Sequence, residues 1–158
     1  MKKIGFIGIG IMGGPIVNHL LHAGYHVFGF SRTKAKVQAQ LDNGMVWCET
    51  IEAVVTQSDV IFTMVGFPQE VEDIYFGENG IFSFAQTGQY LVDLTTSKPS
   101  LAKKIFEYAT TKKIDSLDAP VTGGDLGAIN GTLAMMVGGC EVAFNELLPI
   151  FEQFAKTI

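Results

Sequence analysis

The chain has 158 residues, 47% of them hydrophobic and 17% charged, which is enough apolar material for one folded domain and excludes wholesale disorder. Eleven Lys and Arg against 16 Asp and Glu give a formal net charge of −5, which argues against nucleic acid and anionic membranes as main partners. Cys48 and Cys140 lie far apart with no CxxC pattern, so we expect a reducing, cytoplasmic setting and no metal site. The apolar N-terminal run is interrupted by glycines and Pro15, which is atypical of a signal peptide. No stretch approaches the roughly 18 apolar residues of a membrane helix.

Apolar runs alternate with segments of helical periodicity along the whole chain. The expected strands span residues 3–7, 25–30, 46–48, 59–65, 90–94, 114–119 and 132–137. The expected helices span residues 12–21, 33–41, 51–56, a turn or two after 68, 99–111 and 142–155. Pro149 lies inside the last of these, where we expect a kink or two abutting segments. The alternation predicts βαβ units, and hence an α/β fold with a doubly wound, mostly parallel sheet and helices on both faces.

A glycine pattern follows the first expected strand and opens the first helix. The pattern G-x-G-x-x-G is formed by Gly8, Ile9, Gly10, Ile11, Met12 and Gly13. In this context it is the fingerprint of a dinucleotide-binding Rossmann-type fold, because the first glycine permits a tight turn and the second lets a pyrophosphate approach the backbone. The alternative is a set of glycines that merely allow a tight strand-to-helix turn. We find no G-x-x-x-x-G-K-[ST], so a P-loop nucleotidase is excluded.

The end of the second strand bears on which dinucleotide binds. An NAD site usually places Asp or Glu there, on the ribose hydroxyls, whereas this chain has Ser31, Arg32 and Thr33. Arg32 could pair with a 2′-phosphate, and no carboxylate repels it. We therefore expect NADP rather than NAD. A solvated Arg32 beside a helix-capping Thr33 is the alternative.

Two further loops carry candidate ligand groups. Hydroxyls in the Asp93-Leu94-Thr95-Thr96 segment follow a strand and could face the nicotinamide end of the cofactor, unless they only cap the helix that begins at Pro99. The segment Asp118-Ala119-Pro120-Val121-Thr122-Gly123-Gly124 opens a region with six glycines between positions 123 and 139. A threonine hydroxyl beside two glycine amides could hold a substrate carboxylate. Tight turns between a strand and a helix would explain the same glycines.

Taken together, these segments resemble the N-terminal half of the β-hydroxyacid dehydrogenases, the group of 3-hydroxyisobutyrate dehydrogenase, tartronate semialdehyde reductase and the glyoxylate/succinic semialdehyde reductases. The matching segments are residues 5–13 with Pro15, residues 31–33, residues 93–96 with Pro99, and residues 118–124 continuing to Gly139. The resemblance implies an NADP-binding Rossmann domain over residues 1–158, and an oxidoreductase that exchanges hydride with a small hydroxy acid or semialdehyde. A free-standing dinucleotide-binding regulatory module without catalysis is the alternative.

The resemblance also implies roles for particular residues. Thr96 would contact the nicotinamide half of the cofactor, Met64 and Val65 would line the cofactor groove, and Thr122, Gly123 and Gly124 would bind the substrate carboxylate. Thr122 departs from the usual serine at its position, which keeps the hydroxyl but adds a methyl group.

Members of the group run to nearly twice this length, and the resemblance implies that their catalytic lysine and an all-helical second domain lie beyond residue 158. The chain alone is then expected to lack the general acid. The complete enzymes are expected to be homo-oligomers that act on a small carboxylate substrate.

Overall fold

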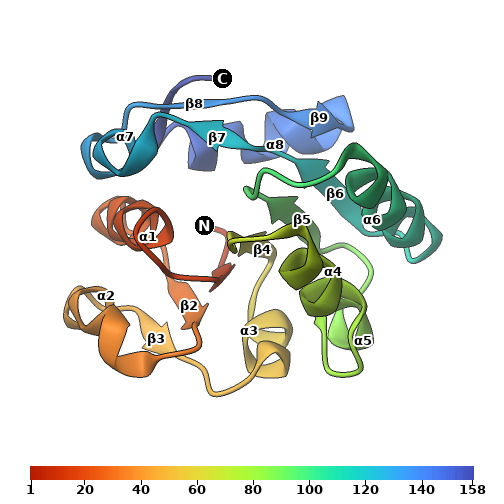
Figure 1. The fold of residues 1–158 in the computed structure, drawn as a ribbon, viewed down its shortest axis with the longest axis horizontal. Coiled ribbons are helices and arrows are strands. Elements are labelled where there is room, and N and C mark those ends of the chain that lie inside the picture. The colour runs from red at the N-terminus through yellow and green to blue at the C-terminus, as the bar shows by residue number, and fades with distance from the viewer.

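The computed structural model describes all 158 residues as two sheets surrounded by helices (Figure 1). The larger sheet has seven strands in the order β3-β2-β1-β4-β5-β6-β9. Its strands are β1 (Ile4–Ile7), β2 (Val27–Phe30), β3 (Val46–Trp47), β4 (Val60–Thr63), β5 (Tyr90–Asp93), β6 (Asp115–Asp118) and β9 (Gly138–Gly139). All neighbours pair in parallel except β6 and β9, so the predicted mostly parallel, doubly wound sheet is confirmed.

Helices separate most of these strands, as the alternating pattern predicted. They are α1 (Gly13–His22), the 3-10 helix η1 (Lys34–Val37), α2 (Gln38–Asp42), α3 (Ile51–Gln57), α4 (Pro68–Phe76), α5 (Ile81–Phe84), α6 (Pro99–Thr111), α7 (Gly124–Asn130) and α8 (Glu141–Phe151). No helix is both long enough and apolar enough to span a membrane.

Two hydrophobic cores lie on opposite faces of the larger sheet, because neighbouring strand residues point to opposite sides. In β4, Phe62 belongs to the core beneath α1, α7 and α8, whereas Ile61 belongs to the core beneath α3, α4, α5 and α6. The Phe62 ring stacks on Phe6 at 5.8 Å and meets the edges of two rings from the C-terminal region. Helices on both faces explain why the strand sequences are continuously apolar.

The C-terminal third differs from the expected arrangement. The strand expected at 132–137 is shorter and lies in a separate three-stranded sheet, in which β8 (Leu133–Met135) pairs with β7 (Val121–Thr122) and β10 (Ala155–Thr157). The helix expected at 142–155 ends at Phe151, and β10 takes up the remaining residues. Pro149 does not divide α8. The helix ends two residues later, and the carbonyl that loses its bond belongs to the exposed Asn145 and can be hydrated.

Several other helical segments also differ from those expected. The region expected as one helix at 33–41 is a 3-10 turn followed by α2. The turn or two expected after Pro68 is a nine-residue helix, and neither the short α5 nor α7, in the glycine-rich region, was expected.

Candidate functional site

Strand register brings the predicted site segments to one edge of the larger sheet. Ile7, the last residue of β1, is level with Phe30 on one side and Thr63 on the other, and Thr63 is level with Asp93. The loops that follow β1, β2, β4 and β5 therefore leave the sheet side by side. The chain order reverses between β1 and β4, which is the switch point where open α/β sheets bind ligands.

The turn after β1 has room only for glycine at its first position. Gly8 has φ +94°, and a Cβ there would collide with the carbonyl of Met64. Its amide donates to the Phe30 carbonyl at 3.1 Å, which ties the turn to β2. A Cβ on Gly10 would meet nothing within 4 Å, so this backbone is open to an approaching group, whereas a Cβ on Gly13 would lie 2.6 Å from the Gly8 carbonyl oxygen. The space over Gly10 thus fits a pyrophosphate, at the N-terminus of α1.

A cleft of about 420 Å³ lies over this turn. Its lining residues are Ile7, Gly8, Ile9, Gly10, Phe30, Ser31, Arg32, Thr33, Lys36, Met64, Val65, Glu70, Asp73 and Ile74. Eight predicted cofactor residues are among them: Gly8, Ile9, Gly10, Ser31, Arg32, Thr33, Met64 and Val65. Four predicted cofactor residues are not part of this lining, namely Ile11, Met12, Gly13 and Thr96. Ile11 is exposed and Gly13 is buried.

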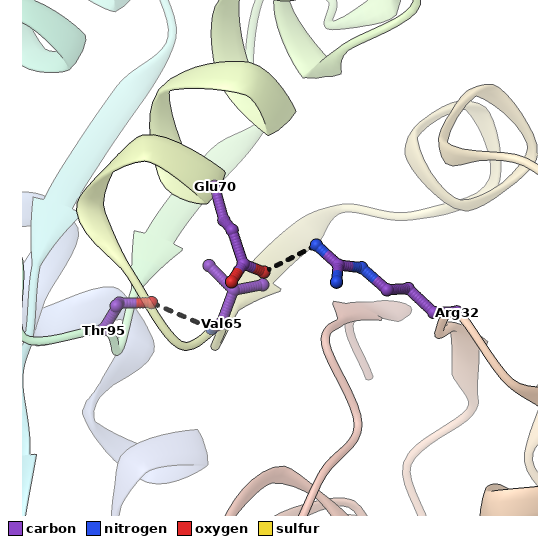
Figure 2. Close-up of polar contacts among 4 residues, drawn as sticks. All are labelled: Arg32, Val65, Glu70 and Thr95. Carbon is purple, nitrogen blue, oxygen red and sulfur yellow. Dashed lines mark hydrogen bonds and ion pairs between the residues drawn. The ribbon is translucent and has the colours of Figure 1, made fainter.

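An ion pair crosses the cleft between Arg32 and Glu70, with Arg32 Nη2 3.0 Å from Glu70 Oε2 (Figure 2). Arg32 comes from the loop after β2, and Glu70 from the first turn of α4. Reasoning from the sequence missed Glu70 and the other charged lining residues, Lys36 and Asp73. For Glu70 and Asp73 the available signal was that a helix following β4, the neighbour of β1, begins at the same edge of the sheet; for Lys36 it was the position four residues after Arg32.

A hydrogen-bonded chain links the β5 loop to the cleft. Thr95 Oγ1 accepts from the Val65 amide at 3.1 Å (Figure 2), and the Thr95 amide donates to Asp93 Oδ1 at 3.1 Å. Thr95 is buried and holds the loop through the Val65 amide, whereas Thr96 is exposed. The resemblance singles out Thr96 in this segment, but no sequence signal indicates that Thr95 binds the Val65 amide.

Two carboxyl groups at the ends of the neighbouring strands β5 and β6 have a raised pKa. Burial raises the pKa of Asp93 to about 6, although its hydrogen bonds from Thr95 and Thr63 oppose the shift. Burial also raises the pKa of Asp118, which pairs with Asp93 across β5 and β6. The phenol of Tyr75, buried beside Thr63 and the Asp93 charge, has its pKa raised as well.

The predicted carboxylate-binding residues lie at the junction of β7 and α7. Thr122 is exposed, and Gly123 has φ +128°, a conformation that side-chain-bearing residues rarely adopt. Gly124 opens α7, and a Cβ there would meet nothing within 4 Å. Two of the later glycines of this region have packing reasons instead: a Cβ on Gly127 would lie 3.2 Å from Leu133, and a Cβ on Gly139 would lie 2.6 Å from Leu117.

His19 connects this region to α1. Its Nε2 lies 2.9 Å from the carbonyl oxygens of both Ala128 and Ile129, at the end of α7. His19 is therefore held by α7, whereas His22, on the same helix, is exposed. The reason is that α7, distant in sequence, packs beside α1.

Comparison with known proteins identifies the family to which the chain belongs. The family model of the NAD-binding domain of 6-phosphogluconate dehydrogenase matches residues 3–158. An uncharacterised oxidoreductase of Bacillus subtilis is 52% identical over 157 residues, covering 99% of this chain and 54% of the relative. The 2-hydroxy-3-oxopropionate reductase of Escherichia coli is 40% identical over 156 residues, covering 99% and 53%.

Solved structures give the same result. The 3-hydroxyisobutyrate dehydrogenase of Mycobacterium tuberculosis, solved with L-serine, superposes with a TM-score of 0.93 at 30% identity, covering 100% of this chain and 53% of the other. A complex named Psf3 with NADP+ and 2-OPP superposes with a TM-score of 0.94 at 30% identity, covering 98% and 55%. The chain thus spans about half the length of the relatives it matches. It belongs to the family of NAD-binding domains described for 6-phosphogluconate dehydrogenase, and it corresponds to the N-terminal domain of the 3-hydroxyisobutyrate dehydrogenase-like oxidoreductases.

Proposed function

We propose that residues 1–158 form the NADP-binding half of a dehydrogenase that acts on small β-hydroxy acids or the matching semialdehydes. The observation that carries the proposal is the cleft at the switch point, which joins the open backbone at Gly10 to the hydroxyls and guanidinium of Ser31, Arg32 and Thr33. A nicotinamide dinucleotide bound there would supply or accept the hydride. The relatives' names support the reaction class, and one structural relative was solved with NADP+.

In this proposal each part of the cleft has its own task. The amides that open α1 hold the pyrophosphate, and Met64 and Val65 line the cofactor groove. Thr96 meets the nicotinamide half, which the tethering of Val65 to Thr95 supports by fixing the two loops relative to each other. Arg32 and Lys36 supply positive charge where a 2′-phosphate would lie, and no carboxylate ends β2.

The substrate carboxylate is assigned to Thr122, Gly123 and Gly124, whose hydroxyl and adjacent amides are hydrogen-bond donors suited to an anion. The proton donor for the substrate oxygen is assigned to a lysine outside residues 1–158, so this chain alone should bind cofactor without turning over. Adding 3-hydroxyisobutyrate with cofactor should shift the amide resonances of Gly123 and Gly124. Unmoved resonances would contradict the carboxylate site, and turnover by the isolated chain would contradict the assignment of the proton donor.

The cofactor assignment is tested by calorimetric titration of the chain with NADPH and NADH. NADPH should bind at least about tenfold more tightly, a difference of about 1.4 kcal/mol, and Arg32→Ala should remove that margin. Lys34→Ala is the matched control, because Lys34 is exposed, two residues away, and outside the cleft. A folded chain that binds neither nucleotide would contradict the dinucleotide proposal. Equal affinity for NADPH and NADH, unchanged by Arg32→Ala, would contradict the NADP assignment.

A further inference from the structure

The Arg32–Glu70 pair lies on the cleft that the proposed function assigns to the cofactor. Arg32 and Glu70 approach from opposite walls, and their side chains meet at 3.0 Å across the space between them (Figure 2). The Arg32 side chain is 82% exposed, whereas that of Glu70 is 25% exposed. Glu70 is therefore the more enclosed partner, and Arg32 the one that reaches out to it.

Such a pair contributes little to folding, because exposed ion pairs gain little in water and lose side-chain freedom. Its larger consequence concerns what else Arg32 can bind. Glu70 takes the Nη2 group, which is part of the guanidinium edge that would grip a phosphate through two parallel bonds. A phosphate on Arg32 must displace the Glu70 carboxylate or lie within a few ångströms of it.

We infer that Glu70 is a specificity-determining residue that competes with the cofactor's 2′-phosphate for Arg32 and so narrows the preference for NADPH over NADH. This inference rests on the proposed function, because it concerns the same site. NADH carries a hydroxyl where NADPH carries the phosphate, so it has no need of a freed guanidinium and meets no added repulsion from Glu70. The effect of Glu70 should therefore fall on one cofactor only.

The test is Glu70→Gln in the same 158-residue chain, titrated with NADPH and NADH at low ionic strength, where charge effects are least screened. Glutamine keeps the size of the side chain and removes its charge. NADPH affinity should rise about tenfold, as expected for removing one negative charge a few ångströms from a phosphate, and NADH affinity should stay within about twofold. Urea unfolding of each variant checks that the fold is intact.

Asp73 provides a matched control on the same helix. It lines the same cleft and carries the same charge, but its carboxylate accepts from Gln69 and has no ion pair with Arg32. Asp73→Asn should therefore raise NADPH affinity by less than about threefold. In an Arg32→Ala background, Glu70→Gln should likewise lose most of its effect, because the group for which the carboxylate competes is gone.

The outcomes separate this inference from the proposed function. If Arg32→Ala weakens NADPH binding but Glu70→Gln leaves it unchanged or weaker, the inference fails and the NADP assignment stands. An equal gain from Asp73→Asn also overturns it, because the general charge of the wall would then be responsible. If the wild-type chain binds both nucleotides equally and Glu70→Gln creates a preference for NADPH, the inference stands while the wild-type preference falls. If no variant binds either nucleotide, both fail.

Discussion

Among single residues, Asp93 couples the interior of the sheet to the cofactor cleft. Its Oδ1 accepts from the Thr63 hydroxyl at 3.0 Å and from the Thr95 amide at 3.1 Å. Thr63 gives its only hydroxyl hydrogen to Asp93, so the buried Tyr75 hydroxyl donates to Thr63. Asp93 thus fixes Thr95, and Thr95 fixes the Val65 amide at the cleft wall. A carboxylate held at this depth makes the domain sensitive to pH.

The sign of that sensitivity follows from the direction of the shift. The pKa of Asp93 is raised to about 6, so the folded state binds a proton that the unfolded state has already released. Stability from this group is therefore greatest at low pH and falls as pH rises toward and through about 6. Between pH 5 and 7.5 the loss should be about 1 kcal/mol.

Asp93→Asn tests this, because asparagine can still accept both hydrogen bonds through Oδ1 but does not titrate. We expect the free energy of unfolding in urea to fall less between pH 5 and 7.5 in the variant than in the wild type, by about 1 kcal/mol. Asp115→Asn is the control, since Asp115 is exposed on the same sheet. A pH dependence unchanged by Asp93→Asn would show that the carboxyl group titrates normally.

At the scale of elements, His19 joins the cofactor helix α1 to α7, which begins at the proposed carboxylate site. His19→Ala should lower the free energy of unfolding by about 1 kcal/mol, because two carbonyls at the end of α7 lose their donor. His22→Ala, an exposed position on the same helix, should change it by less than about 0.5 kcal/mol. Amide exchange in α7 should also quicken only in His19→Ala. Equal losses in the two variants would show that the link to α7 contributes nothing.

The sequence predicted best those elements whose limits or periodicity are marked by nearby residues. The helix expected at 99–111 has the observed limits of α6, because Pro99 pre-sets its first turn and its apolar residues recur at helical spacing. The three-residue β10 and the two-residue β7 and β9 were missed, because they lack the apolar run that marks the equally short β3. They exist because another strand lies beside them. The last helix was extended too far for the same reason, since nothing local distinguishes Ala155 in a strand from Ala155 in a helix.

At the scale of the whole molecule, some residues of the candidate site could be predicted from local sequence and others could not. Residues near the glycine fingerprint and at the end of β2 could be predicted, because a motif and a fixed spacing mark them. Glu70, Asp73 and Lys36 could not, because no motif marks them. Glu70 and Asp73 enter the cleft through the strand order, which puts β4 and its helix beside β1, whereas Lys36 enters it from the 3-10 helix η1 that follows β2. The opposite wall of the cleft is thus a property of the topology rather than of any segment.

A cleft assembled from three separate segments, those that follow β1, β2 and β4, should couple cofactor binding to the stability of the entire domain. A ligand that binds only the folded chain stabilises it by RT ln(1 + [L]/Kd), about 2.7 kcal/mol at 100 times Kd. For a domain of this size, NADPH at that concentration should raise the melting temperature by roughly 5–10 °C. Arg32→Ala should reduce the shift at the same NADPH concentration, whereas Lys34→Ala should leave it unchanged. Differential scanning calorimetry measures both shifts. NADPH binding without any rise in melting temperature would mean that the site persists in the unfolded chain, which a site built from the segments after β1, β2 and β4 together cannot do.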